Sequence, residues 1–92
     1  MIQSFEHKGL KRLFERNDRS RVGADILPRV ENILSALDAA DAPQALDLPG
    51  YRLHRLKGDR TGYWAVTVRA NWRIIFRFEN GDALDVELID YH

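Results

Sequence analysis

Residues 72–89 read WRIIFRFENGDALDVELI, and this stretch decides the fold of the chain. Apolar and polar side chains alternate on both sides of Asn80-Gly81, which is the pattern of two half-buried strands. An Asn-Gly pair between two such runs indicates a tight hairpin, because a type I′ turn needs positive φ at both central positions. We therefore predict two antiparallel strands, 72–78 and 83–89, joined by this turn.

Alternation also assigns the faces of these strands. The side chains predicted to face the core are Trp72, Ile74, Phe76 and Phe78 on the first strand and Leu84, Val86 and Leu88 on the second. Arg73 points to the opposite, open face. Strict alternation sends Asp90 and His92 to the core face and Tyr91 to the open one. If these three residues serve one site, the chain end must leave regular strand geometry.

The rest of the chain supplies helices and further strands. We expect a short strand at 2–5, helices at 7–17 and 25–40 from their apolar stripes, a connector at 41–50, and strands at 51–57 and 63–69. Pro28 is acceptable in a helix because it falls in the first turn. The order β-α-α-β-β-β-β predicts an α+β domain, in which two helices pack on one face of a mostly antiparallel sheet.

Size and composition define the class of protein. Ninety-two residues make a single domain, 1–92, and a charged content of 30% is typical of globular proteins. The absence of cysteine excludes disulfides and cysteine-based metal or redox sites. We find neither an apolar run of signal-peptide length nor a membrane span, so we expect no membrane association and a cytoplasmic location.

The charges are unevenly distributed, although the formal net charge is zero. Residues 51–78 hold seven basic side chains and one acid, Asp59, whereas residues 79–92 hold five acids and no lysine or arginine. This pattern is compatible with ordinary pairing of charges between strands. The abundance of arginine also favours a basic strip that binds phosphate, since a guanidinium matches phosphate oxygens in a bidentate fork.

Two short segments carry groups suited to acid-base chemistry. His54 lies in a run crowded with cations, and the chain ends on Asp90-Tyr91-His92. Histidine can donate or accept a proton near neutral pH. Two imidazoles among arginines, with a carboxylate and a phenol, could cleave a phosphodiester without a metal ion.

The sequence resembles the HigB (plasmid-maintenance killer) toxins of the RelE/ParE superfamily over nearly its whole length. The blocks that carry the resemblance are Ser4–Leu10, Ile33–Ala40, Leu53–Arg60, Gly62–Val66, Asn71–Phe76 and Asp90-Tyr91-His92. The resemblance implies a ribosome-dependent mRNA endonuclease that inhibits translation at the small-subunit decoding site. It also implies a helix-turn-helix antitoxin of the HigA type, and functional residues at the positions of His54, Asp90, Tyr91 and His92.

The reaction suggests a role for each residue. Metal-free cleavage of RNA needs a base for the 2′-OH, an acid for the leaving 5′ oxygen and cations for the phosphorane. We assign the two proton transfers to His54 and His92, without deciding which is acid and which is base. Asp90 is expected to orient a histidine, and Tyr91 to stack on a base or orient the phosphate. The expected cations are Arg73 for the phosphorane, Lys57 for the scissile phosphate, and Arg52, Arg55 and Arg77 for the RNA backbone.

Other interpretations of these residues stay open. Arg73 is also placed to pair with Glu87 or Asp85 on the neighbouring strand. His7, at the start of the first helix, is expected to be structural or solvent-exposed and is left out of the site. A His/Asp/His metal site is disfavoured because the cationic surroundings repel a divalent ion, and no cofactor is expected. Two further functions share the fold: a ParE-like inhibitor of DNA gyrase that cleaves nothing, and an inactive antitoxin partner that serves as a transcriptional co-repressor.

Overall fold

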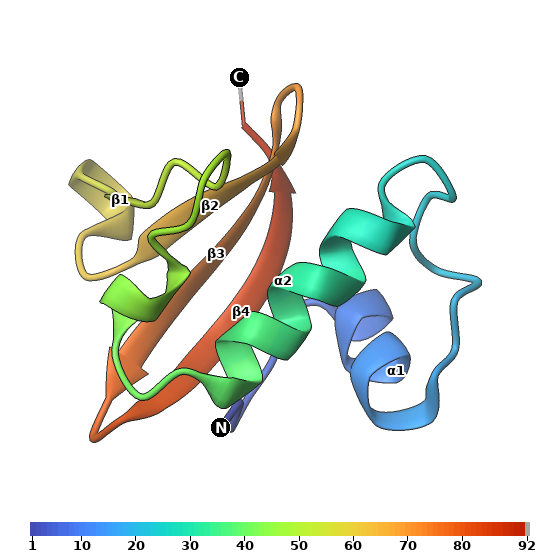
Figure 1. Ribbon diagram of the computed structural model, residues 1–92, viewed down its shortest axis with the longest axis horizontal. Helices are drawn as coiled ribbons and strands as arrows, with labels where there is room; N and C mark the ends of the chain where they lie inside the picture. Colours follow the sequence, from blue (N-terminus) through green and yellow to red (C-terminus); the bar gives the residue numbers. More distant parts are fainter. Residues whose placement is uncertain (92) are drawn as a thin grey trace.

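The computed structural model describes residues 1–91, and it has two helices packed on one face of a four-stranded antiparallel sheet (Figure 1). The sheet order is β1-β2-β3-β4, so strands adjacent in the sequence are adjacent in space. The elements are α1 (Lys8–Arg16), α2 (Leu27–Ala39), β1 (His54–Arg55), β2 (Trp64–Arg69), β3 (Trp72–Glu79) and β4 (Asp82–Asp90), with short 3₁₀ helices η1 (Pro43–Leu46) and η2 (Gly58–Arg60). The predicted α+β class is confirmed.

The hairpin of β3 and β4 forms as the sequence predicts. Asn80 and Gly81 both have positive φ, at 52° and 82°, and Phe78 pairs with Ala83 directly beside the turn. The positive φ values are those that a type I′ turn requires. The local chemistry of these two residues therefore sets the register of the longest strands in the sheet.

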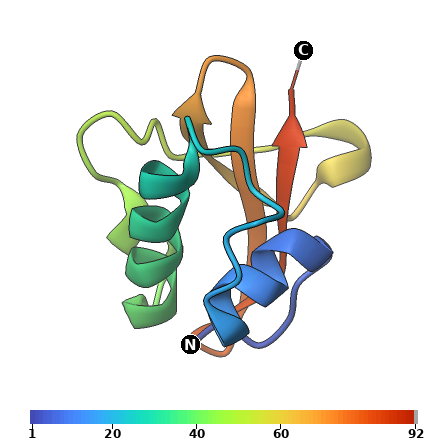
Figure 2. The same cartoon turned by 90° about the vertical axis from the view of Figure 1, so that its right-hand side faces the viewer.

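The core lies between this sheet and the helices, which cover the same face (Figure 2). It is apolar throughout, and its fully buried side chains include Leu10 of α1, Ile33 and Leu37 of α2, Val66 of β2, Ile74 and Phe76 of β3, and Val86 of β4. Pro28 stands in the first turn of α2, as expected, where its missing N–H costs no hydrogen bond. No helix among residues 1–91 is long and apolar enough to cross a membrane.

A β-bulge in β4 corrects the predicted faces. Ile75 pairs with Glu87 but Arg77 pairs with Leu84, so β4 contains one extra residue, and Asp85 takes a left-handed φ of 53°. Because the extra residue reverses the alternation, Leu84 lies on the open side of the sheet rather than in the core, where we predicted it.

The N-terminal segment stabilises this bulge. Ser4 Oγ accepts a hydrogen bond of 2.8 Å from the Asp85 backbone N–H and donates one of 3.2 Å to the Asp85 carboxylate. In place of the predicted strand at 2–5, the segment makes two isolated parallel bridges, from Ile2 to Ala83 and from Phe5 to Val86. The two bridges lie on either side of the bulge at Asp85.

The strand predicted at 51–57 is also shorter than expected. Regular pairing is confined to His54 and Arg55, because Arg52 adopts a left-handed φ of 52° and interrupts the strand. Pairing with β2 continues on both sides of this interruption through single hydrogen bonds, one of them 2.7 Å from Thr67 N–H to the Tyr51 carbonyl.

The chain end stays in the sheet as far as the structure describes it. Asp90 pairs with Trp72, and the Tyr91 backbone N–H donates a 2.7 Å hydrogen bond to the Asn71 carbonyl. Asp90 therefore keeps strand geometry as the last residue of β4, so it does not meet the condition under which all three terminal residues would share one site; His92 lies outside the described residues. Trp72, predicted to face the core, is 36% exposed because it begins β3 at the sheet's end.

Candidate active site

The open face of the sheet has a small apolar cluster of its own. Leu56, Ala65 and Ile75 are buried there, with Tyr63 and Ile89 packed against them. The polar side chains of this face therefore lie around this apolar cluster, which we call the open-face cluster.

Strand register places His54 and Arg73 on this open face. Directly opposed residues of antiparallel strands project from the same side. His54 opposes Ala65, which opposes Ile75, and both of these belong to the open-face cluster. In the neighbouring row Arg73 opposes Ile89, which packs on the same cluster. Two of the predicted site residues thus share a face although they come from β1 and β3.

The backbone of Arg52 fixes the ring of His54. The left-handed conformation of Arg52 turns its carbonyl toward the imidazole, and Nδ1 of His54 lies 2.8 Å from that oxygen. A carbonyl oxygen only accepts hydrogen bonds, so the proton of this contact belongs to Nδ1. Nε2 is then the nitrogen available to a ligand, and His54 is exposed.

Arg73 is anchored by the turn between β2 and β3. Its Nη1 donates hydrogen bonds of 2.6 Å to the Ala70 carbonyl and 3.1 Å to the Trp72 carbonyl. Among the described residues Arg73 makes no ion pair, so the alternative of pairing with Glu87 or Asp85 is not realised there. The carbonyls hold one nitrogen of the guanidinium and leave its other donors for an anion.

Tyr91 joins Lys57 in a shallow pocket of about 210 Å³ beside the open-face cluster. Leu56 contributes an apolar wall, and the remaining lining residues are Asp59 and Arg60 from η2. Sequence reasoning did not place Asp59 and Arg60 in the site. The sequence contains one indication of this part of the site: Asp59 is the one acid among the basic residues of 51–78.

The remaining predicted residues lie elsewhere. Arg55 opposes Trp64, which packs on the main core, and its guanidinium lies 4.8 Å from the centre of that indole ring. Arg55 therefore projects from the helix side, as does Asp90 opposite Trp72. Arg52 is exposed at the strand interruption, and His92 lies outside the described residues.

Arg77 is occupied by two carboxylates. Its Nη1 lies 3.0 Å from Asp85 and its Nη2 lies 2.8 Å from Glu79. Arg77 therefore takes part in ordinary charge pairing, with Asp85 on the neighbouring strand and with Glu79 on its own strand. Its role in phosphate binding stays a prediction.

Two shifted pKa values show how burial acts near the sheet. Burial raises the pKa of the Tyr63 phenol, and the Asp85 carboxylate adds to this effect. Tyr63 therefore keeps its proton at neutral pH.

Burial lowers the pKa of His7, whose Nδ1 accepts a 3.1 Å hydrogen bond from the Leu10 N–H at the start of α1. His7 is thus a helix cap, in agreement with the structural role predicted for it.

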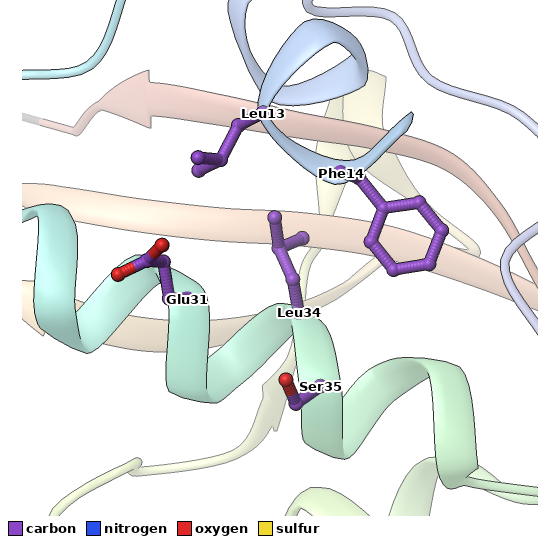
Figure 3. A pocket seen from close by; sticks show the side chains of 5 residues that line it. All are labelled: Leu13, Phe14, Glu31, Leu34 and Ser35. Atoms are coloured by element: carbon purple, nitrogen blue, oxygen red, sulfur yellow. The ribbon is translucent and has the colours of Figure 1, made fainter. Parts of the chain in front are cut away.

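A second hollow, of about 240 Å³, lies between the two helices (Figure 3). Leu13 and Phe14 of α1 face Leu34 of α2 across it, and Glu31 and Ser35 complete the lining. No histidine or basic residue lines this hollow, so it does not belong to the site on the open face. Within residues 1–91 no group of three or more histidine or acidic side chains is arranged to hold a metal ion.

Two solved structures share this arrangement of helices and sheet. YafQ from E. coli strain BL21(DE3) superimposes with a TM-score of 0.60 and 15% sequence identity, covering 95% of this chain and 89% of that one. The heterotetrameric YoeB-YefM toxin-antitoxin complex from Staphylococcus aureus contains a chain that matches with a TM-score of 0.62 and 12% identity, covering 100% of this chain and 98% of that one. At these identities the likeness shows the fold alone.

Sequence comparison then gives the family. The family described as the RelE-like toxin of type II toxin-antitoxin system HigB matches residues 3–92, and the chain belongs to this HigB-like toxin family. It is similar to Endoribonuclease HigB of Proteus vulgaris, with 53% identity over all of both proteins. It is also similar to Toxin HigB-1 of Vibrio cholerae serotype O1, with 33% identity over 96% of this chain and 95% of that protein. A toxin of this kind has an antitoxin as its partner.

Proposed function

We propose that this toxin cleaves mRNA on the ribosome by attack of the 2′-OH on the adjacent phosphorus, with histidines as acid and base. The coarser activity, that of an endoribonuclease toxin of a type II toxin-antitoxin system, rests on full-length homology at 53% identity. The ribosome, the residue roles and the metal-free mechanism are our additions.

The observation that carries the proposal is the hydrogen bond from His54 Nδ1 to the Arg52 carbonyl. It fixes the tautomer, so that Nε2 carries a lone pair when the ring is neutral and a proton when the ring is charged. The neutral ring can therefore take the proton of the 2′-OH, and the charged ring can give one to the 5′ oxygen, without any reorientation. A preset ring is what acid-base catalysis near neutral pH requires.

His92 is the second member of the proposed pair, and its neighbours have separate tasks. The register puts Asp90 on the opposite side of the sheet from His54, so Asp90 acts on the chain end rather than on His54. Tyr91 lines the pocket with Lys57 and positions the nucleotide beside the scissile bond. In this proposal His54 of β1 is one histidine of the pair, and His92, which follows Tyr91 in the sequence, is the other.

The cations of the open face offset the charge of the transition state. Arg73, anchored on two carbonyls, offers its remaining N–H groups to the phosphorane. Lys57 is exposed at the pocket and holds the scissile phosphate. Arg52 and Arg77 bind the RNA backbone further out, and this role demands that Arg77 exchange its carboxylate partners for phosphate. Arg55 projects from the helix side, so its predicted contact with RNA requires the RNA backbone to pass around the edge of the sheet at β1.

The proposed partners are the small ribosomal subunit with its mRNA and an antitoxin. The described pocket is small, at about 210 Å³, so we expect the message to be aligned by something outside the toxin. The small ribosomal subunit, which holds mRNA in its decoding site, supplies this alignment in our proposal. The toxin then acts in the cytoplasm, and its antitoxin is a helix-turn-helix protein of the HigA type.

Primer extension on ribosome-bound mRNA tests the proposal. His54→Ala is expected to slow cleavage by about 10²-fold or more, the usual contribution of an acid-base group. Asn32→Ala, on the exposed side of α2, is a matched control that leaves cleavage unchanged. Once the complex of toxin, ribosome and mRNA has formed, adding a chelator of divalent ions should not change the rate of mRNA cleavage. Wild-type rates from His54→Ala would remove His54 from the mechanism, and absence of cleavage by the wild type would favour a non-nucleolytic toxin.

A further inference from the structure

The guanidinium of Arg29 joins α2 to the segment that leads into β1. Its Nη2 donates hydrogen bonds of 2.9 Å to the Gly50 carbonyl and 3.3 Å to the Thr67 carbonyl of β2. Its central carbon also lies 4.4 Å from the centre of the buried Tyr51 ring, which makes a cation–π contact. One side chain therefore fixes residues 50 and 51 against both the helix and the sheet.

This arrangement is unfavourable for Arg29 itself. Arg29 lies in the first turn of α2, where a positive charge opposes the helix dipole. Its Nε is buried and makes no hydrogen bond with residues 1–91, and a buried donor without a partner lowers stability. The helix and the core thus give no reason for an arginine at this position. Its role lies in the contacts that its Nη2 and its flat face make with the segment at 50–51.

Three consecutive carbonyls of this segment accept hydrogen bonds from three different elements. The Gly50 carbonyl accepts from Arg29 of α2, and the Tyr51 carbonyl accepts from a backbone N–H of β2 at 2.7 Å. The third, the Arg52 carbonyl, lies 2.8 Å from Nδ1 of His54. Because each peptide bond is planar, only two torsions per residue separate neighbouring carbonyls. Fixing the first two carbonyls therefore restricts where the third one points.

The conformation of Arg52 needs this support. Its φ of 52° lies in the left-handed region, which is strained for a residue other than glycine. Such a conformation persists only where the surrounding structure holds it. The side chain of Arg52 is exposed, so its own packing does not hold it. The two residues that precede Arg52 are the ones that Arg29 fixes.

We propose that Arg29 is a positioning residue for His54, although it belongs to α2 and acts only through the backbone of residues 50–52. The inference rests on the proposed function, in which Nε2 of His54 transfers a proton. With Arg29 in place, the Arg52 carbonyl keeps the proton of the neutral ring on Nδ1. Without Arg29, Arg52 relaxes toward an ordinary φ and its carbonyl turns away. The ring then takes up both tautomers and more than one orientation.

Cleavage of ribosome-bound mRNA by Arg29→Met measures the loss of positioning. Methionine keeps a flexible apolar stem but has no donor. The rate at saturating toxin should fall about tenfold or more, because a misplaced catalytic group costs at least this much. The toxin concentration that gives half of this rate should change by less than about threefold, since in this proposal Arg29 does not contact RNA.

A double variant tests whether Arg29 acts through His54. Adding Arg29→Met to His54→Ala should slow cleavage by no more than about twofold further, because residues that act through one group are not additive. An undiminished loss in the His54→Ala background would make Arg29 a purely structural residue and overturn the proposal.

NMR measures the tautomer of His54 without catalysis. At a pH of about 8.5, where histidine side chains are mostly neutral, proton–nitrogen correlations of the imidazole show which ring nitrogen carries the proton. The wild type should show His54 protonated at Nδ1, and Arg29→Met should show a mixture of both tautomers. The same tautomer in both proteins would refute the inference. If the wild type cleaved no mRNA, the proposed function would fail, and this measurement would still decide whether Arg29 sets the ring of His54.

A second arginine gives the matched control. Arg19 joins the loop before α2 to that helix through an ion pair of 3.1 Å with Glu31. Arg19→Met removes the same charge and a comparable contact, so it should keep the wild-type rate and the wild-type tautomer of His54. Equal losses in both variants would assign the effect to charge or stability and end the proposal. If Arg29→Met does not fold, Arg29→Lys, which keeps the charge without the flat guanidinium, should show a smaller change in the same direction; no change would count against the proposal equally.

Discussion

His7 makes the stability of this toxin depend on pH, because it is partly buried, which lowers its pKa, and because it caps α1 through a hydrogen bond. Its Nδ1 accepts from the Leu10 N–H and so satisfies one free donor at the start of α1. Only the unprotonated nitrogen can accept, so protonation removes the cap. The resulting positive charge also lies at the positive end of the helix dipole, next to Lys8.

The direction of the effect follows from the lowered pKa of His7 in the folded protein. As pH falls, the unfolded chain binds a proton at His7 first, near its ordinary pKa of about 6.5. The free energy of unfolding is therefore highest above this pH, decreases as pH falls through about 6.5 toward the folded pKa, and stops changing below it. An N-cap contributes about 1 kcal/mol. For a domain of this size that corresponds to a melting temperature about 4–8 °C lower.

Thermal unfolding of three proteins between pH 8 and pH 5 measures this effect. His7→Ala should melt about 4–8 °C below the wild type at pH 8. His7→Asn keeps a strong capping residue but cannot titrate, so it should match the wild type at pH 8 and surpass it at pH 5. If His7→Asn lost as much stability as the wild type between these pH values, His7 would not be the group responsible.

Three other predictions concern packing and the chain end. Gly9→Ala should lower the free energy of unfolding despite alanine's better helix propensity, because the added Cβ would lie 2.9 Å from both Arg21 Cβ and the His7 ring; urea denaturation measures it. Phe76→Ala, at a fully buried position, should cost about 3–5 kcal/mol in the same assay, and a cost under 1 kcal/mol would contradict the described core. Deletion of His92 should abolish mRNA cleavage and leave the melting temperature within a few degrees of wild type; full cleavage by the deletion variant would remove His92 from the mechanism.

The sequence was sufficient where structure is set by local chemistry. Asn80-Gly81 specified the hairpin, the helical stripes specified both helices, and Pro28 marked a first turn. Alternation also put Arg73 on the open face. In each case the signal lies within a short segment of the sequence.

Prediction failed where distant segments decide the outcome. The bulge at Asp85 depends on Ser4, a residue far away in the sequence, so strict alternation misplaced Leu84. The left-handed conformation of Arg52 shortened β1 and also aimed a carbonyl at His54, which no period could reveal. Asp59 meets Tyr91 in one pocket only because β4 returns beside η2.

The contact between Ser4 and Asp85 joins residues that are 81 positions apart. This contact cannot form until nearly the whole chain has left the ribosome that makes it, and closing so long a loop delays folding. The strand that it supports, β4, also leads into Tyr91 and the chain end. A chain synthesised only as far as β3 therefore lacks the partner that Ser4 needs. The first residues made and one of the last strands made thus stabilise each other, so this edge of the sheet closes late in folding.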